Sequence, residues 1–135
     1  VRGLNADELA EPNSFAIEAA TAAFREGASW LDALRQYIYG NKQLVQHFLQ
    51  QELPQIHLDS EEATYLLWLD CSRVSEDVPE LCAFIRRETG LFLTAGAQYR
   101  GNGRQFMRMN IACPGRRIED ALQRLKRGIF YYRAD

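Results

Sequence analysis

The sequence has 135 residues, of which 47% are hydrophobic and 25% are charged, and this size and composition exclude a disordered chain and favour one compact domain. Its 16 basic and 18 acidic residues give a net charge of −2 and form no basic stripe, so we expect neither nucleic acid nor a membrane as a partner. No apolar run approaches the roughly 20 residues that span a bilayer, and the first residues carry no hydrophobic secretory signal, so we expect a cytoplasmic location.

Two helices are predicted in the first half of the chain. Asn13 or Ser14 can cap a helix that continues through the alanine-rich stretch FAIEAATAAFRE and ends at Gly27. A capping-box pattern follows, and apolar residues then recur with helical spacing up to about Leu53. Because Pro54 stops this second helix, it is predicted to be long and amphipathic.

Beyond the proline, the apolar pattern changes to a period of two, which indicates strands. The stretch QIHL can form a short edge strand, and ATYLLWLDC is a near-continuous apolar run of the kind found in strands buried on both faces. The next segment, VPELCAFIRRETG, is typical of a helix, with Asp77 near its start and Gly90 at its end.

Two further strands and a helix complete the chain. The strands LFLTAG and QFMRMNIAC are joined by the polar loop AQYRGNGR, in which Gly101, Asn102 and Gly103 favour a turn. The last helix is predicted from about Arg116 to Phe130. The fold class is therefore α+β, with helices, one of them long and near the N-terminus, packed on a small and mostly antiparallel sheet.

Arg108 is the candidate site residue, because it stands in the middle of an otherwise apolar strand. Alternation places Met107, Met109 and Ile111 on the core face and Arg108 on the other. There its planar guanidinium could hold a carboxylate or phosphate through two parallel hydrogen bonds. A solvated arginine or an internal salt bridge explains the same pattern, and periodicity alone does not separate these readings.

The remaining polar and sulfur-containing residues predict no catalytic or metal site. Cys71, Cys82 and Cys113 are odd in number and lack a CxxC pair, so we expect three reduced thiols rather than disulfides or a zinc site. The histidines, His47 and His57, have no further ligand at suitable spacing. The motif GNG lacks the third glycine of a dinucleotide-binding fingerprint and is interpreted as a turn.

Three segments resemble, in order and spacing, the C-terminal part of fold type I, pyridoxal-phosphate-dependent class I/II aminotransferases. They are PNSFAIEAATAAFREGASWLDALRQYIYGNKQLVQHFLQQELP, EATYLLWLDCS and FMRMNIACPGRRIEDALQRL, and together they cover nearly all of the chain. The group that the sequence resembles most is that of the MalY/PatB cystathionine β-lyases, in which patterns such as EGTYLxWLD and RLNFACPR recur. Two positions depart from these patterns, with Ala63 in place of a glycine and Gly115 in place of an arginine.

The resemblance implies a role for Arg108 and a place for this chain in a larger enzyme. Arg108 matches the arginine that grips the α-carboxylate of the amino-acid substrate. Residues 29–135 match the small domain, and residues 1–28 match a segment that leads from a large domain of the same chain. The family also implies a homodimer, with pyridoxal 5'-phosphate bound mainly by the large domain.

The Schiff-base lysine of the family is not matched in this sequence. Only two of the 16 basic residues, Lys42 and Lys126, are lysines, and neither lies in a matching motif. We therefore assign no catalytic, cofactor-binding or metal-binding residue, and we expect the isolated chain to be inactive. The sequence also opens on Val1 in what resembles a polar connection, so we expect a piece of a longer enzyme.

The resemblance leaves the reaction open between two outcomes. One is β-elimination from a sulfur amino acid such as cystathionine, which we favour, and the other is transamination. A free-standing, non-catalytic module that binds or senses an amino acid through Arg108 is an alternative function. An interaction domain that uses the long helix as its contact surface is a third.

Overall fold

The structure is a computed structural model that describes residues 13–59 and 63–134. The chain divides into two compact units, Val1–Gln36 and Tyr37–Asp135, and each is described by itself. Residues 1–12 of the segment predicted to link to a large domain lie outside the described residues. Within the described ranges, no helix combines the length and the apolar content needed to traverse a bilayer.

The first unit contains helix α1 (Ser14–Glu26) and the beginning of α2 (Ala28–Glu52). The side chain of Asn13 caps α1 by accepting a hydrogen bond of 2.9 Å from the backbone N–H of Ala16, as the sequence predicted. No residue of α1 is buried, and the aromatic rings of Phe15 and Phe24 are more than four-fifths exposed. The buried residues of α2, by contrast, all lie in the second unit.

The second unit is built on a four-stranded antiparallel sheet in the order β1-β2-β4-β3. Its strands are β1 (His57–Asp59), β2 (Leu66–Asp70), β3 (Thr94–Ala95) and β4 (Phe106–Asn110). The predicted strand LFLTAG is therefore only two residues long. Burial alternates along β2, with Leu67 and Leu69 inside, so the prediction that this strand is buried on both faces is wrong.

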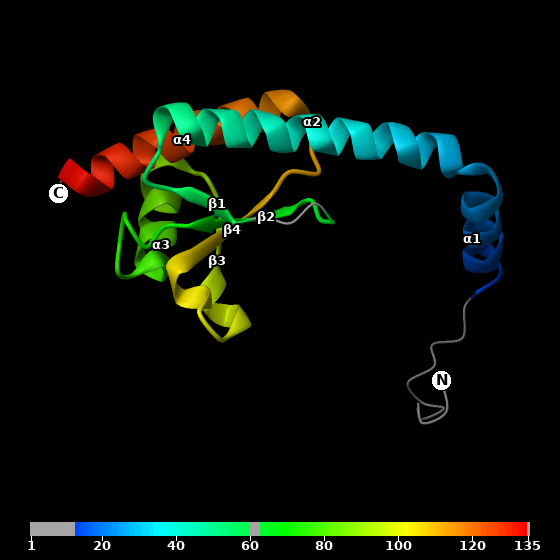
Figure 1. Cartoon of the computed structure of the whole chain (residues 1–135). Coiled ribbons are helices and arrows are strands. Elements are labelled where there is room, and N and C mark those ends of the chain that lie inside the picture. Colours follow the sequence, from blue (N-terminus) through cyan, green and yellow to red (C-terminus); the bar gives the residue numbers. More distant parts are fainter. Residues whose placement is uncertain (1–12, 60–62, 135) are drawn as a thin grey trace. The chain divides into compact units, whose positions relative to one another are not determined.

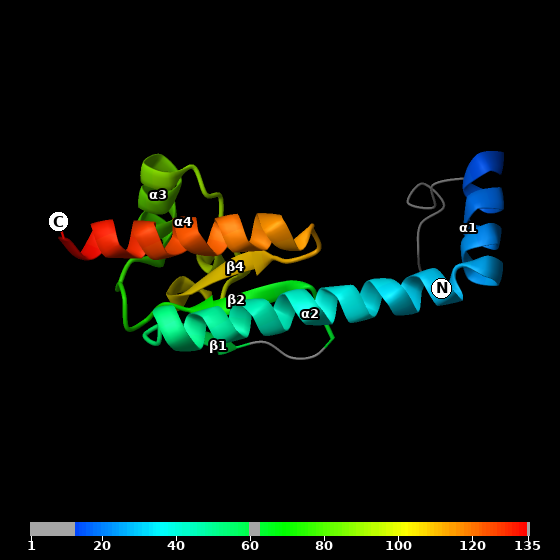
Figure 2. The ribbon, with the colours of Figure 1, turned by 90° about the horizontal axis from the view of Figure 1, so that it is seen from above.

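Three helices enclose the core of the second unit. They are α2 from Tyr37 onward, α3 (Val78–Thr89) and α4 (Gly115–Ala134). Both α2 and α4 run along one face of the sheet (Figures 1 and 2), and α3 packs against α4. The buried side chains come from all three helices and from β2 and β4, and the largest include Val45, Leu67, Leu81, Met107, Ile118 and Leu125. The predicted α+β fold is confirmed.

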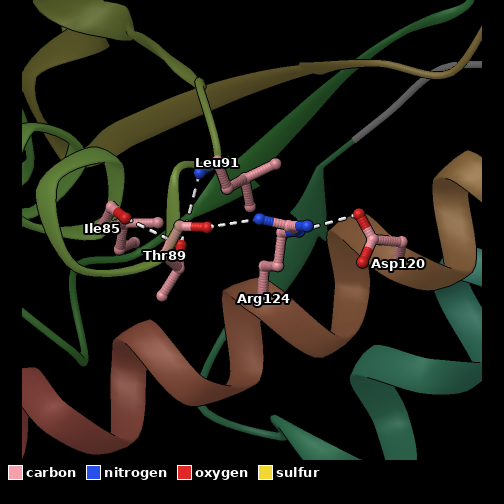
Figure 3. A network of polar contacts seen from close by, with 5 residues as sticks. All are labelled: Ile85, Thr89, Leu91, Asp120 and Arg124. Carbon is pink, nitrogen blue, oxygen red and sulfur yellow. Dashed lines mark hydrogen bonds and ion pairs between the residues drawn. The ribbon is translucent and has the colours of Figure 1, made fainter.

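A polar network fixes the end of α3, as Figure 3 shows. The guanidinium of Arg124 on α4 donates hydrogen bonds to the backbone carbonyl of Thr89 at 2.6 Å and to the carboxylate of Asp120 at 2.7 Å. Gly90 follows with a φ of 72°, the left-handed conformation that ends many helices. Because the last carbonyls of a helix carry partial negative charge, Arg124 stabilises this terminus and the turn toward β3.

The loop between β3 and β4 differs from the predicted simple turn. It contains two short 3₁₀ helices, η2 (Gly96–Tyr99) and η3 (Gly103–Gln105), separated by Arg100 and Gly101 with φ values of 66° and 59°. Of the two glycines in the predicted turn, Gly101 has a positive φ and Gly103 does not. In Figure 1 this loop lies on the side of the sheet opposite α2 and α4.

Candidate functional site

Arg108 lies at the centre of the sheet face that points away from α2 and α4. It is directly opposite Trp68 on β2 and Thr94 on β3 in the strand register. Its neighbours Met107 and Met109 are buried on the other face, so the predicted alternation along β4 is confirmed. Arg108 itself is half-buried.

The guanidinium of Arg108 contacts an aromatic ring. Its Cζ atom lies over the ring of Tyr99, 5.0 Å from the ring centre. Among the residues that the structure describes, no carboxylate is within salt-bridge distance of Arg108, and its side chain forms no hydrogen bond. The internal salt bridge that the sequence left open is therefore not found in these ranges.

An aromatic cluster surrounds this contact. Trp68 packs edge-on against Tyr99, with ring centres 5.3 Å apart, and edge-on against Phe106, with ring centres 5.9 Å apart. The backbone of Gly96 is so close to Trp68 that a Cβ on this glycine would lie 2.8 Å from the indole ring. Trp68 thus connects β2, β4 and η2, and it fixes the ring on which Arg108 rests.

A groove of about 470 Å³ opens beside the aromatic cluster. Trp68, Tyr99 and Phe106 form its apolar part, and its polar wall is formed by Asp59, Thr64, Arg100 and Asn102. Arg108 is not among the lining residues, but Tyr99 both lines the groove and carries the Arg108 guanidinium.

A larger hollow, of about 770 Å³, lies between α3 and the segment that contains β3. Its two arginines already contact aromatic rings, with Arg86 over Phe92 at 5.1 Å and Arg87 over Phe84 at 5.0 Å. Neither Arg108 nor its aromatic partners line it. We therefore place the candidate site at the smaller groove, because Tyr99 lines it and carries the Arg108 guanidinium.

Neither lysine lies at the candidate site. Lys126 on α4 forms a salt bridge of 2.5 Å with Glu52 on α2, and Lys42 is half-buried on α2. Neither residue lines the groove. Pyridoxal phosphate requires a Schiff-base lysine, so the residues described here do not by themselves form a site for this cofactor.

The cysteines and histidines also lie apart from the groove. Burial raises the pKa of the Cys82 thiol to about 11 and that of Cys71 further, so neither thiol is suited to nucleophilic attack near neutral pH. All three cysteines are free, as predicted, although Cys113 is only half-buried. No group of His, Cys, Asp or Glu residues in the described part of the chain could hold a metal ion.

Sequence reasoning identified Arg108 but missed Trp68 and Tyr99. Trp68 could have been found, because it alternates with the two buried leucines of β2 and must share the face of Arg108. Tyr99 gave no such signal, since it lies in a loop whose path depends on the contact between η2 and η3.

Comparison with known proteins finds relatives among cystathionine β-lyases and aminotransferases. No protein-family model matches the sequence. The chain is 36% identical over 114 residues to cystathionine β-lyase PatB of Bacillus subtilis, and the match covers 84% of this chain and 30% of that protein. Its fold matches a pyridoxal-phosphate-bound putative aminotransferase from Clostridium difficile with a TM-score of 0.86 at 28% identity, over 91% of this chain and 32% of that one.

A second solved structure agrees with the first. The pyridoxal-phosphate-bound C-S lyase from Staphylococcus hominis, in complex with the inhibitor L-cycloserine, matches with a TM-score of 0.81 at 30% identity, over 90% of this chain and 30% of that one. The chain thus spans about a third of the length of the proteins that it matches. It belongs, as a segment of this length, to the family of pyridoxal-phosphate-dependent aminotransferases and C-S lyases that includes PatB.

Proposed function

We propose that this chain is the C-terminal small domain of a pyridoxal-phosphate-dependent C-S β-lyase or aminotransferase, and that Arg108 binds the α-carboxylate of its amino-acid substrate. The observation that carries the proposal is the guanidinium of Arg108, held over the Tyr99 ring with no acidic partner among the described residues. A half-buried arginine that lacks a counter-ion favours an anionic ligand, because bidentate binding satisfies its donors and balances its charge.

The role of Arg108 is to orient the substrate. Two parallel hydrogen bonds from its fork fix the plane of the α-carboxylate and so restrict rotation at the adjacent Cα atom. Pyridoxal phosphate, held by the rest of the protein, supplies an electron sink for the negative charge that develops at Cα. This domain therefore fixes the orientation of the substrate, and the remainder of the enzyme holds the cofactor that stabilises the charge at Cα.

We favour β-elimination from a sulfur amino acid over transamination. The support is the similarity to PatB, which is named a cystathionine β-lyase, and to the C-S lyase of Staphylococcus hominis. Elimination from cystathionine breaks the Cβ–S bond and releases a thiol, and uptake of one water molecule then releases the remaining three carbons as pyruvate and ammonia. On this proposal the large domain supplies the Schiff-base lysine, residues 1–28 lead from it, and the full-length enzyme is a homodimer.

The carboxylate-binding role is tested by comparing an amino-acid substrate with its α-carboxamide in the full-length protein that contains this chain. The amide keeps the shape of the acid but has no charge, so wild-type enzyme should prefer the acid strongly. In Arg108→Lys, which keeps the charge but not the fork, we expect this preference in kcat/KM to fall about tenfold or more. An unchanged preference would reject the role of Arg108.

The isolated 135-residue chain provides a second test, because it contains only Lys42 and Lys126 as lysines. Mixed with pyridoxal phosphate and cystathionine, it should release no thiol. If the chain binds amino acids while the full-length protein shows no turnover, its function is that of a non-catalytic binding module and not that of an enzyme domain. Thiol release by the chain alone would contradict the proposal that the large domain supplies the Schiff-base lysine.

A further inference from the structure

The guanidinium of Arg108, which has no acid beside it among the described residues, raises the question of what fixes its direction. An arginine side chain has many rotamers, and about 2 kcal/mol of rotamer entropy opposes its fixation. In many proteins a carboxylate holds such a residue, but none of the described acids reaches Arg108. Among the described residues its guanidinium forms no hydrogen bond or ion pair, and it makes a cation–π contact with the ring of Tyr99.

We propose that Tyr99 is a positioning residue for Arg108, and that it holds the guanidinium for a substrate carboxylate without competing for its hydrogen-bond donors. The inference rests on the carboxylate-binding function proposed for Arg108. An aromatic ring attracts a cation through its quadrupole and accepts no fork-to-fork hydrogen bonds. An acid in the same place would neutralise the charge and occupy the donors that the substrate requires.

Tyr99 can serve this purpose because its own ring is fixed. The edge of Trp68 packs against it at 5.3 Å, and Trp68 is held in turn by Phe106 on β4. On the backbone side, Gly96 at the start of η2 approaches Trp68 and Gly103 so closely that a side chain there would collide with both. These contacts hold the loop that carries Tyr99 against β2, whose residue Trp68 lies opposite Arg108 in the sheet.

The contact depends on the ring and not on the phenol hydroxyl. Within the described residues, the hydroxyl of Tyr99 takes part in no hydrogen bond. Tyr99→Phe should therefore preserve the position of Arg108, whereas Tyr99→Leu should release it. Phe92→Leu provides a matched control, since Phe92 forms the same kind of contact with Arg86 at 5.1 Å but does not line the groove beside Tyr99.

The contact is measured directly by NMR on the 15N-labelled 135-residue chain. The Nε–H signal of Arg108, assigned by its loss in Arg108→Lys, should be displaced by the ring current of Tyr99. We expect Tyr99→Leu to move this signal toward that of a free arginine, and Tyr99→Phe and Phe92→Leu to leave it in place. A signal with the same position in wild type and Tyr99→Leu overturns the inference.

The functional consequence is measured in the full-length protein as the preference for the acid over the α-carboxamide. Tyr99→Leu should reduce this preference by about two- to thirtyfold, the range expected for a cation–π contact, and Tyr99→Phe should rescue it. If Arg108→Lys loses the preference while Tyr99→Leu retains it, the inference fails and the proposed function stands. If Arg108→Lys retains it, the proposed function fails, and the inference fails with it.

Discussion

Gly96 and Gly103 touch through their backbones. A Cβ on Gly103 would lie 2.2 Å from the carbonyl oxygen of Gly96, and a Cβ on Gly96 would lie 2.4 Å from the carbonyl oxygen of Gly103. Such distances are too short for any side chain, so both positions require glycine because of space and not because of φ. This contact joins η2 to η3 and holds the loop that carries Tyr99.

The contact between the two glycines predicts that one added methyl group at either position lowers the stability of the fold. In Gly103→Ala the backbone of η2 or η3 must shift, and we expect the free energy of unfolding to fall by about 1–3 kcal/mol, as for overpacked cores. Gly40→Ala is the control, because nothing lies within 4 Å of a Cβ at this position in α2. Alanine there should stabilise the chain by about 0.5–1 kcal/mol in urea unfolding. Equal effects of the two substitutions would contradict this account.

Arg108 should matter for the substrate and hardly for stability. Arg108→Lys removes the bidentate fork, and a charge-assisted hydrogen bond contributes roughly 1.5–3 kcal/mol, so kcat/KM of the full-length protein should fall about ten- to a hundredfold. Arg108→Ala should lower kcat/KM further. Because Arg108 packs on the face opposite the core, thermal unfolding should change by less than about 1 kcal/mol in either variant. A loss of stability in proportion to the loss of activity would make Arg108 a structural residue.

Asn41 should be a strong determinant of stability. It is buried, and its Nδ2 donates hydrogen bonds of 2.9 Å to the carbonyls of Ile111 and Cys113, which links α2 to the segment that follows β4. Asn41→Ala leaves both carbonyls without this partner and should cost about 1–3 kcal/mol in urea unfolding. Asn41→Asp should cost more at neutral pH, because a carboxylate offers no donor and repels the carbonyl oxygens.

The control for Asn41 is Gln43→Ala, at an exposed position of the same helix, which should stay within about 0.5 kcal/mol of wild type. If Asn41→Asp were no more harmful than Asn41→Ala, the two hydrogen bonds would not be the source of the effect.

The buried thiol of Cys82 should make the fold sensitive to alkali. Burial raises its pKa from an ordinary value of 9.0 to about 11, so between these values the unfolded chain loses the proton while the folded chain keeps it. The contribution of Cys82 to the free energy of unfolding is therefore fully present below pH 9. It is lost as the pH rises toward 11, and the free energy of unfolding then falls by at most about 1.4 kcal/mol per pH unit. Urea unfolding between pH 8 and pH 11 should show a shallower decline in Cys82→Ala than in wild type. Parallel declines would show that Cys82 keeps its ordinary pKa in the fold.

The sequence was sufficient to predict the helices and the face on which Arg108 lies. Asn13 and Gly90 act at helix ends as predicted, and the period of two along β4 separated Arg108 from Met107 and Met109. These features depend on neighbours within a few residues, which the sequence displays directly. The helix α4 also formed, although it begins and ends beyond the predicted limits of 116 and 130.

The surroundings of Arg108 could not be predicted, because they depend on contacts between distant segments. The apolar run of β2 was interpreted as buried on both faces, since the sequence does not show that Trp68 faces a loop and not a second layer of helices. Similarly, the sequence does not show that Arg124 on α4 caps α3 through the carbonyl of Thr89, 35 residues away. Each of these contacts joins elements that are far apart in the chain.

The short outer strands of the sheet have a consequence for the behaviour of the protein at high concentration. As described, β1 has three residues and β3 has two, while the five-residue strands β2 and β4, which pair with each other along their whole length, lie between them. A strand from another molecule therefore finds few unpaired backbone donors and acceptors at either edge. Short edge strands are one means by which natural sheets resist edge-to-edge aggregation, so this sheet is protected against growth into fibrils even though its central strands are rich in leucine and methionine.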